Sequence, residues 1–497
     1  MNKIPKLLFF IAFIFQSLTG LAQNTSSDSI DFTLERIIDF ARDNSSRALQ
    51  AENRKENRYW QYRTYLSNYK PQLSLSGRLP EFRRSVVAVQ QESGAYRFQP
   101  VTNNIIDLNL RLSQTIGATG GEIFINSQAQ RFDDLNEPRF TQYSGNPAIL
   151  GFVQPLFAYN RLRWDKKIEP LRYEESLKGY QEDLEQVAVN ATDLFFDLLL
   201  QQVNLEIALK NLGNNDTIYK IGQGRYNLGK IAENDLMQLE LNVLNSQQDV
   251  SQAELELETA TLRLKTFIGW TSEEKFNLIL PDEIPTFEVD EQIALREARN
   301  NRSAAVSFKR QLLQADAQIA EAKGASGLNI DVYGSVGLTN RGNSISDIYV
   351  NPNDQQALTI GFDIPIVDWG RQKSMRKTAE ANKNLVEQTI SQDEVNFDQE
   401  IYTQVKRFKM LRNQLKITFK ADIISHDRYE IAKNRYLIGK ISITDLNIAL
   451  QDKDLAKRAY ISSLRNFWTS YYNLRLLTLY DFASNQPIYY EDEETSY

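Results

Sequence analysis

The sequence predicts a mixed β and α fold built from two tandem structural repeats, each with a strand segment followed by a long helical hairpin. The first observation is a motif that occurs twice, because residues 225–236 read RYNLGKIAENDL and residues 435–446 read RYLIGKISITDL. At the same offset, residues 155–161 (PLFAYNR) lie over residues 365–371 (PIVDWGR). Two matches at one offset indicate a tandem duplication. The other two observations are strand-like alternation and long apolar heptads in each copy.

The first 22 residues have the pattern of a secretory signal peptide. Lys3 and Lys6 precede an apolar run over 7–15, and small residues surround Leu21 before Gln23. The run is short for a membrane span, although an N-terminal membrane anchor is the alternative. We therefore expect an exported chain that begins at residue 23.

The composition excludes several classes of function. The 497 residues include no cysteine, four methionines and a single histidine, His426. Thiolate catalysis, iron–sulfur clusters and zinc sites are excluded, and no catalytic motif is present. A net charge of −7 without a basic block argues against nucleic-acid binding. We expect no enzyme activity, no metal and no cofactor.

Alternating apolar and polar residues predict the strands. In the second copy, the alternation covers 330–338 and 358–366, inside a β hairpin at about 328–367. The first copy has a longer β segment, at about 72–157, and its extra residues carry two more alternating runs joined by a glycine-rich turn at 117–121. We expect these runs to add strands to the sheet, with longer connections near 91–104 and 133–146. An outer loop or plug is the alternative.

Strand length leaves two environments open. Strands of 9–11 residues suit a tilted membrane barrel, but a soluble sandwich hairpin has the same periodicity.

The remaining residues predict helices of unusual length. Residues 160–227 and 371–437 would each extend about 100 Å at 1.5 Å per residue. Four shorter helices of about 55–60 Å are expected over 31–69, 232–268, 289–324 and 442–480. Two short helices end to end match one long helix. We expect 232–268 and 289–324 to lie along 160–227, while 442–480 and 31–69 lie along 371–437.

These elements divide the chain into four parts. Residues 1–22 are the signal peptide, 23–287 the first repeat, 288–480 the second repeat, and 481–497 an acidic C-terminal tail. The helical hairpins cover 160–268 and 371–480, and the segment 269–287 would lie at mid-height beside the tail.

The duplicated motifs lie at the turns of the two helical hairpins. Gly229 and Gly439 are placed to end a helix with positive φ. Asp235 and Asp445 then fall in the first turn of the next helix, and Ser442 has the spacing of a capping box with Asp445. Helix capping accounts for both acids, and a role in a pore is the alternative.

The signal peptide, the two repeats and the signature R-Y-x-x-G-x-x-x-x-x-D-L at both tips resemble the TolC family of bacterial outer-membrane efflux proteins. The resemblance covers essentially the whole mature chain. It implies a mixed transmembrane β-barrel plus a long α-helical (coiled-coil) barrel, closed as a homotrimer, normally with four strands per protomer. It also implies an exit duct in the cell outer membrane, with a large periplasmic portion.

The resemblance further implies partners. The duct would contact outer-membrane lipid and receive substrates from an inner-membrane pump through a periplasmic adaptor, in efflux or type I secretion. Elementary physics agrees with oligomeric closure, because a helix pair needs lateral neighbours and a few strands cannot close a wide barrel.

The family's gate residues map onto the hairpin tips. The resemblance implies that Tyr436 reaches Asp235 of a neighbouring helix pair and that Asp445 lines the aperture. Two positions depart from the family: Ile448 replaces a second pore acid, and Ile441, next to Lys440, replaces a gate arginine. The aperture would then carry three carboxylates per trimer rather than six. The expected adaptor contacts are Arg225, Leu228, Gly229, Lys230, Arg435, Ile438, Gly439 and Lys440.

Two other functions fit parts of the sequence. A periplasmic adaptor is also exported and coiled-coil, but it would show one helical hairpin rather than two. A coiled-coil scaffold would not need the alternating strands. The sequence does not identify the transported substrate.

Overall fold

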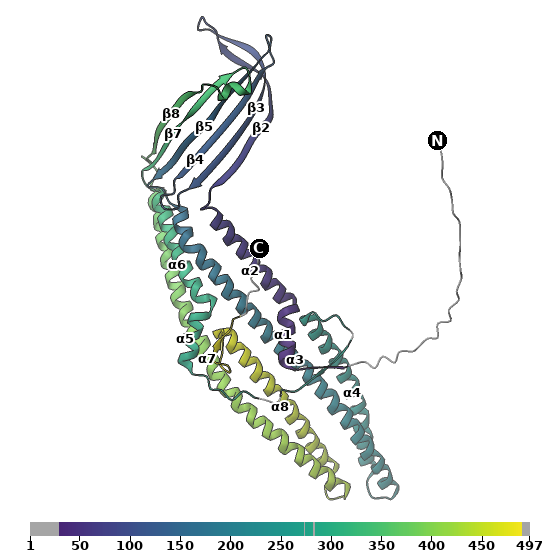
Figure 1. Ribbon diagram of the computed structural model, residues 1–497. Helices are drawn as coiled ribbons and strands as arrows, with labels where there is room; N and C mark the ends of the chain where they lie inside the picture. The colour runs from purple at the N-terminus through teal and green to yellow at the C-terminus, as the bar shows by residue number, and fades with distance from the viewer. Residues whose placement is uncertain (1–28, 273, 282–283, 490–497) are drawn as a thin grey trace, which may run out of the picture.

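The computed structural model describes residues 29–272, 274–281 and 284–489. The chain is elongated, with a curved sheet at one end and long helices running away from it (Figure 1). The predicted signal peptide and the acidic residues at the end of the predicted tail lie outside the described residues.

The sheet contains six antiparallel strands in the order β2-β3-β4-β5-β7-β8. The strands are β2 (Gln72–Gln90), β3 (Tyr96–Thr115), β4 (Glu122–Asp134), β5 (Phe140–Leu156), β7 (Asn329–Gly342) and β8 (Asn353–Asp363). The extra residues of the first repeat form β3 and β4, so they add strands to the sheet, as predicted. A short 3-10 helix, η1 (Ile345–Tyr349), lies between β7 and β8.

The connections between these strands are shorter than expected. Strand pairing continues to Gln90 opposite Tyr96 and to Asp134 opposite Phe140, which leaves only 91–95 and 135–139 as turns. The prediction of long connections near 91–104 and 133–146 is therefore wrong. Polar residues near the strand ends concealed the continuing ladder.

The helices follow the predicted lengths with two breaks. The hairpins are α3 (Arg161–Asn227) with α4 (Glu233–Ile268), and α7 (Arg371–Leu437) with α8 (Ile443–Thr478). The expected single helices over 31–69 and 289–324 are each interrupted by one extended residue, Ser45 and Arg302. The resulting helices are α1 (Leu34–Asn44), α2 (Ser46–Ser67), α5 (Glu291–Asn301) and α6 (Ser303–Gly324). No helix in the described ranges is both long enough and apolar enough to cross a membrane.

The end-to-end pairing of the short helices differs from the prediction. Helices α1 and α2 continue α4 along one side of α3, whereas α5 and α6 continue α8 between α3 and α7. The helices therefore form a layer of four columns, with α4 and α7 at its lower edges. The pairing of 289–324 with 232–268 is wrong.

The cause lies at the junction of α4 with α1. Strand β1 (Ser29–Phe32) pairs in parallel with β6 (Lys275–Leu278), which follows α4 in the chain. The Trp270 ring packs on the Phe32 and Phe40 rings, with centroids 5.4 and 5.0 Å apart. Gly269 has φ +78°, and a Cβ there would lie 2.7 Å from the Asn44 carbonyl oxygen. The close approach places the end of α4 against the end of α1.

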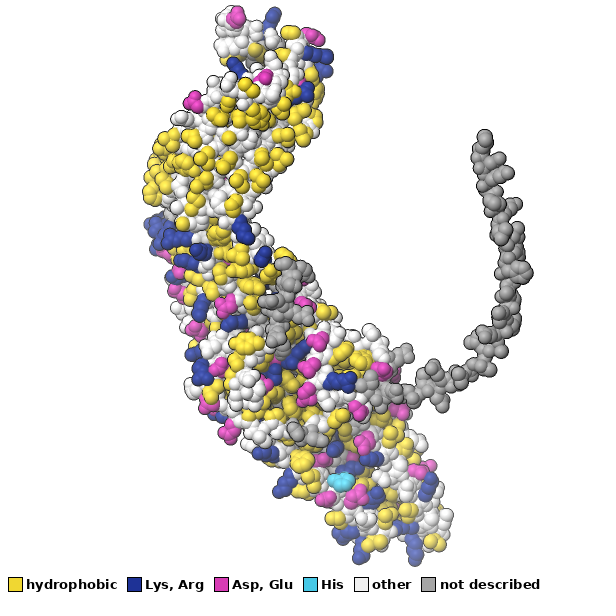
Figure 2. Space-filling model, viewed as in Figure 1, with side chains coloured by type: hydrophobic (Ala, Val, Ile, Leu, Met, Phe, Trp, Pro, Cys, Tyr) yellow, Lys and Arg dark blue, Asp and Glu magenta, His cyan; other side chains and the backbone are white. Residues whose placement is uncertain are grey.

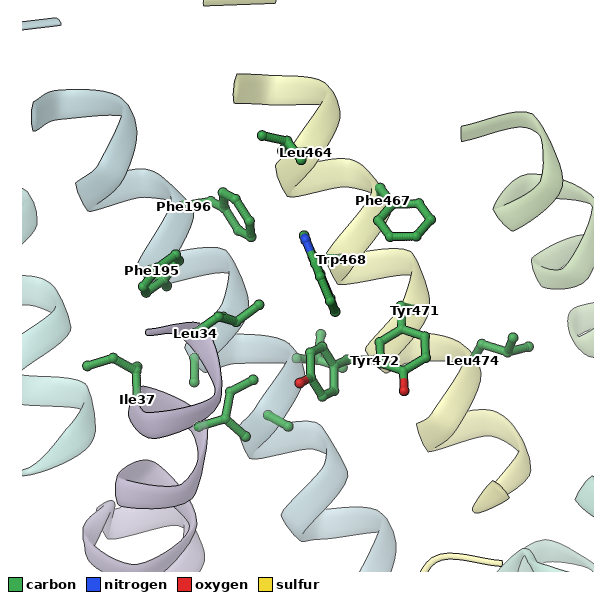
Figure 3. Packing of buried hydrophobic residues seen from close by; sticks show 14 of the residues in the cluster. Leu34, Ile37, Phe195, Phe196, Leu464, Phe467, Trp468, Tyr471, Tyr472 and Leu474 are labelled. Atoms are coloured by element: carbon green, nitrogen blue, oxygen red, sulfur yellow. The ribbon is translucent and has the colours of Figure 1, made fainter. Parts of the chain in front are cut away.

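The largest hydrophobic core lies at mid-height, where α1, α3 and α8 meet (Figure 3). Its members include Phe195 and Phe196 of α3, Trp468 and Tyr472 of α8, and Leu34 of α1. This core joins the two repeats and the N-terminal helix into one body.

The first part of the predicted tail also belongs to this core. Strands β9 (Tyr480–Asp481) and β10 (Gln486–Pro487) form a short hairpin, and the Phe482 and Ile488 side chains are buried. The boundary at 481 is therefore not the end of the folded chain, because these apolar side chains return to the helices.

Candidate functional site

One face of the sheet is apolar and exposed. Leu112, Ile125, Leu150 and Val336 are register partners across four adjacent strands, and their side chains are 38–53% exposed. The same face continues with Leu73, Leu75, Leu110, Ile123, Phe152, Leu358, Ile360 and Phe362. Figure 2 shows this apolar band over the sheet. Such a face is stable only against lipid or another apolar layer.

The opposite face of the sheet is polar. Arg111 forms an ion pair with Glu122 at 2.7 Å and lies 4.0 Å from the Phe124 ring centroid. Arg78 forms an ion pair with Asp107 at 2.5 Å. Apolar and polar residues therefore alternate between two environments, as they do in a membrane sheet with a water-filled inner side.

The soluble sandwich alternative is wrong. In the described part of the chain, the other strand pairs, β1 with β6 and β9 with β10, lie among the helices. They do not form a second layer on the apolar face. Strands β2 and β8 are the open edges of the sheet.

The two hairpin tips lie at the end of the helices farthest from the sheet (Figure 1). Gly229 and Gly439 have φ +63° and +75°, and a Cβ at either glycine would meet nothing within 4 Å. Their amide groups donate to the carbonyl oxygens of Tyr226 and Tyr436 at 2.8 and 2.9 Å. Positive φ, and not close packing, is what each turn requires of its glycine.

The two tip acids cap the helices that begin there. Asp445 accepts hydrogen bonds from the Ser442 amide at 3.1 Å and the Ser442 hydroxyl at 2.8 Å. These bonds hold the pKa of the Asp445 carboxyl below its ordinary value. Asp235 accepts a longer bond, at 3.4 Å, from the Ala232 amide. The capping role is thus observed for both acids, and a pore role would have to be an additional one.

Tyr436 lies where the two tips meet. It is buried in a small cluster with Ile218 of α3, Leu239 of α4 and Leu446 of α8. Burial raises the pKa of the Tyr436 hydroxyl, and the negative charge of Asp235 raises it further. Among the described residues no hydrogen bond joins Tyr436 to Asp235, so the acid acts on the phenol through its field.

Arg225 is the residue that links the two tips. Its guanidinium lies 5.6 Å from the Tyr436 ring centroid and donates to the Leu437 carbonyl at 2.8 Å. Its positive charge also opposes the rise in the pKa of Tyr436. We expected Arg225 only as an adaptor contact, and its bond to the second tip was not predicted. The repeated motif gives no signal for it, because Arg435 at the equivalent position is exposed.

The outer surface of the tips is partly apolar. Leu228 and Ile438 are 74% and 66% exposed, and Lys230 and Lys440 are also exposed. The end of each hairpin therefore carries one exposed aliphatic residue and one exposed cation.

The sheet and the paired tips define a class of protein: the subunit of a membrane duct with a long helical extension. Comparison with known proteins agrees. Residues 120–270 and 294–478 match the outer membrane efflux protein family. The chain belongs to this family, which confirms the predicted membership, and no curated protein matches its sequence.

Solved structures show the same fold. The Campylobacter jejuni CmeC outer membrane channel has a TM-score of 0.66 at 17% identity, over 92% of this chain and 87% of that one. The Vibrio cholerae outer membrane protein VceC has a TM-score of 0.63 at 14% identity, over 92% and 97%. The open state of the Neisseria gonorrhoeae MtrE channel has a TM-score of 0.60 at 16% identity, over 92% and 89%.

The predicted fold class, a β sheet continued by long helices in two repeats, and the predicted localisation are therefore confirmed, whereas closure as a homotrimer stays a prediction. The chain is an outer-membrane exit duct subunit with a large periplasmic helical portion, and the adaptor alternative finds no support. The family is one of channel proteins.

Proposed function

We propose that three copies of the chain close into one duct that carries substrates from an inner-membrane pump across the periplasm and outer membrane. The open edges β2 and β8 support closure of the sheet, because an unpaired edge strand in lipid would leave its backbone groups without hydrogen-bond partners. Three six-stranded sheets would form an 18-stranded wall.

The helical layer supports the same closure. Its lower edge columns, α4 and α7, expose rows of large aliphatic side chains. These include Leu241, Leu244, Leu255 and Leu262 on α4, and Leu385, Val395, Ile417 and Ile424 on α7, each 49–69% exposed. Apolar rows on both edges fit a neighbouring copy on each side.

Mass measurement in mild detergent tests this assembly. We expect about three times the protomer mass of 57.3 kDa, less the mass of the signal peptide. A stable monomer that also forms conducting channels would refute the closure.

The tips would form the gate of the duct. Tyr436, Asp235 and Arg225 already connect the two hairpins of one copy. The tandem offset suggests an equivalent contact between copies, with Arg435 donating to the Asn227 carbonyl of the next copy. Tyr226 would then take the place of Tyr436, and its 40% exposure in one copy would be covered.

Single-channel conductance in planar bilayers tests the gate. The combined change Tyr436→Phe and Asp235→Asn keeps an acceptor at the cap and should raise the conductance, because the phenol hydroxyl and the negative charge beside it are both removed from the closed tip. Asp216→Asn, on an exposed i,i+4 pair with Lys220, is the matched control and should leave conductance unchanged. Wild-type conductance in the double variant would show that these residues only shape the helix ends.

The aperture and the adaptor have separate tests. Asp445→Ala should weaken cation preference, because a ring of three carboxylates would be removed from a narrow opening. Lys440 lies beside this ring and would offset part of its charge.

For the adaptor, we expect Leu228→Ser with Ile438→Ser to abolish co-purification of a pump–adaptor complex while conductance persists. Retained co-purification would place the adaptor elsewhere.

A further inference from the structure

A collar of basic side chains surrounds the junction between the sheet and the helices. Its members are Arg161, Arg163, Lys166 and Lys167 in α3, with Arg371, Lys373, Arg376 and Lys377 in α7. All eight are exposed. Figure 2 shows Lys and Arg atoms gathered directly beside the apolar band. We call these eight residues the basic collar.

Few carboxylates balance the collar. Asp165 pairs with Arg161 at 3.3 Å, and Glu380 pairs with Lys377 at 2.8 Å. The Asp368 carboxylate accepts the backbone amides of Gly370 and Gln372, at 2.9 Å each. Within the described chain, no ion pair joins Arg163, Lys166, Lys373 or Arg376 to an acid. The collar therefore keeps a large positive excess.

The dipoles of α3 and α7 add to the positive potential of the collar. The first turns of α3 and α7 contain no acidic residue, and each contains two basic ones. Cations at a helix N-terminus oppose the helix dipole, where acidic residues would be favourable. Both repeats tolerate this arrangement at the same level of the molecule. An external anion at that level would compensate for it.

The collar lies at headgroup depth beside the apolar sheet. Helix α3 begins five residues after β5 ends, and Lys167 lies about 9 Å further along the helix axis than its first residue. The polar layer on each side of a bilayer is roughly 5–8 Å deep, and a lysine or arginine side chain spans most of the remaining distance. Phe157 and Trp369, between the strands and the collar, are 72% and 96% exposed. Exposed aromatic rings at this level are typical of a membrane interface.

We propose that the basic collar binds the phosphate headgroups of anionic phospholipids in the leaflet that faces the periplasm. This inference rests on the proposed function, which places the sheet in the membrane. The contiguity of the collar with the exposed aromatic rings and the apolar band selects a lipid headgroup over an anionic polymer further from the membrane. Both repeats contribute, so a closed trimer would carry the collar around its whole circumference.

Quenching by brominated lipids tests the inference, because Trp164 and Trp369 lie within the collar region. The purified trimer is placed in vesicles of phosphatidylglycerol and phosphatidylcholine, with bromine on one lipid or the other. The collar variant replaces Arg163, Lys166, Lys373 and Arg376 with glutamine. The control variant replaces Lys309, Arg407, Lys416 and Lys420, which are exposed cations of α6 and α7 away from the sheet.

We expect the wild type and the control variant to prefer phosphatidylglycerol by at least tenfold, since each engaged cation contributes roughly fivefold. The collar variant should fall to a ratio near one, and high salt should reduce the wild-type preference. A wild type without preference, or equal ratios in both variants, would overturn the inference.

Two further readouts separate the possible failures. If the collar variant loses binding to isolated peptidoglycan but keeps its lipid preference, the collar binds the cell wall and the lipid inference is wrong. Conductance in phosphatidylcholine bilayers reports on the duct itself. Channels that conduct without any preference for anionic lipid would refute lipid binding by the collar and leave the proposed function intact. A trimer that prefers anionic lipid but never conducts would refute the proposed function instead.

Discussion

A buried carboxylate at mid-height offers a sharp test of how the repeats are held together. Glu185 of α3 is fully buried, and its side chain is shared by Arg42 of α1 and Arg475 of α8. The contacts are 2.7 Å from Arg42 and 3.1 Å from Arg475, and both arginine side chains are only 15% exposed. Removing one partner from a buried ion pair costs about 3–5 kcal/mol, because the remaining charge loses its compensation.

The structure sets the expectation for Glu185→Ala within this range. Arg42 also contacts Asp39 at 3.4 Å, and Arg475 also contacts Asp481 at 3.2 Å. Each arginine therefore keeps a second acid, and we expect a loss near the lower end, about 3 kcal/mol. Glu185→Gln keeps the shape and one acceptor, so its loss should be smaller, about 1.5–3 kcal/mol.

Denaturant unfolding followed by helical circular dichroism measures the change, at equal protein concentration because assembly contributes to stability. Asp183→Ala is the matched control. It lies two residues away on α3 and pairs with Arg54 at 2.7 Å, but the two side chains are 59% and 43% exposed. Such a pair contributes at most about 1 kcal/mol. If Glu185→Ala and Asp183→Ala differ by less than about 1 kcal/mol, the assignment of Glu185 as a buried link is refuted.

Three further predictions concern the tips. Gly439→Ala should destabilise its turn by about 1–2 kcal/mol because φ is +75°. The control Gly179→Ala, in the interior of α3, should not destabilise its helix. Hydrogen exchange near each site measures the two effects. The pKa of Asp445 is lowered in the folded chain, so its cap stabilises the tip above the ordinary carboxyl pKa and is lost as the pH falls through the lowered value. Acid should therefore lower the protection factors of the amides at the start of α8, and an Asp445→Asn variant whose protection factors keep the full acid dependence would contradict this. Arg435→Ala should raise conductance if that residue bridges two copies, while Lys433→Ala should not; equal effects would argue against the bridge.

Much of the local structure follows from the sequence. The second long helix was expected over 371–437 and is found at Arg371–Leu437. The tip glycines have the expected positive φ, and the longer first repeat adds two strands. These features depend on periodicity, turn chemistry and the tandem repeat, which act over a few residues or can be compared between copies.

Other features were decided only by the tertiary structure. A heptad defines which face of a helix is buried, but not which helix covers it, so the pairing of α4 with α1 depended on the β1–β6 ladder and on Trp270. Breaks at Ser45 and Arg302 let single helices turn without any proline or glycine to mark them.

The partners of the charged side chains that link the helices were also decided only by the tertiary structure. Glu185 was not singled out from the sequence, and Arg225 was placed only among the adaptor contacts, because neither residue differs locally from its solvated neighbours. Glu185 acquires its role when Arg42 and Arg475 arrive from helices α1 and α8, distant in sequence, and Arg225 does so when the second tip presents the Leu437 carbonyl. A charge is buried only after the surrounding elements have packed, so its partners depend on long-range geometry rather than on the local pattern.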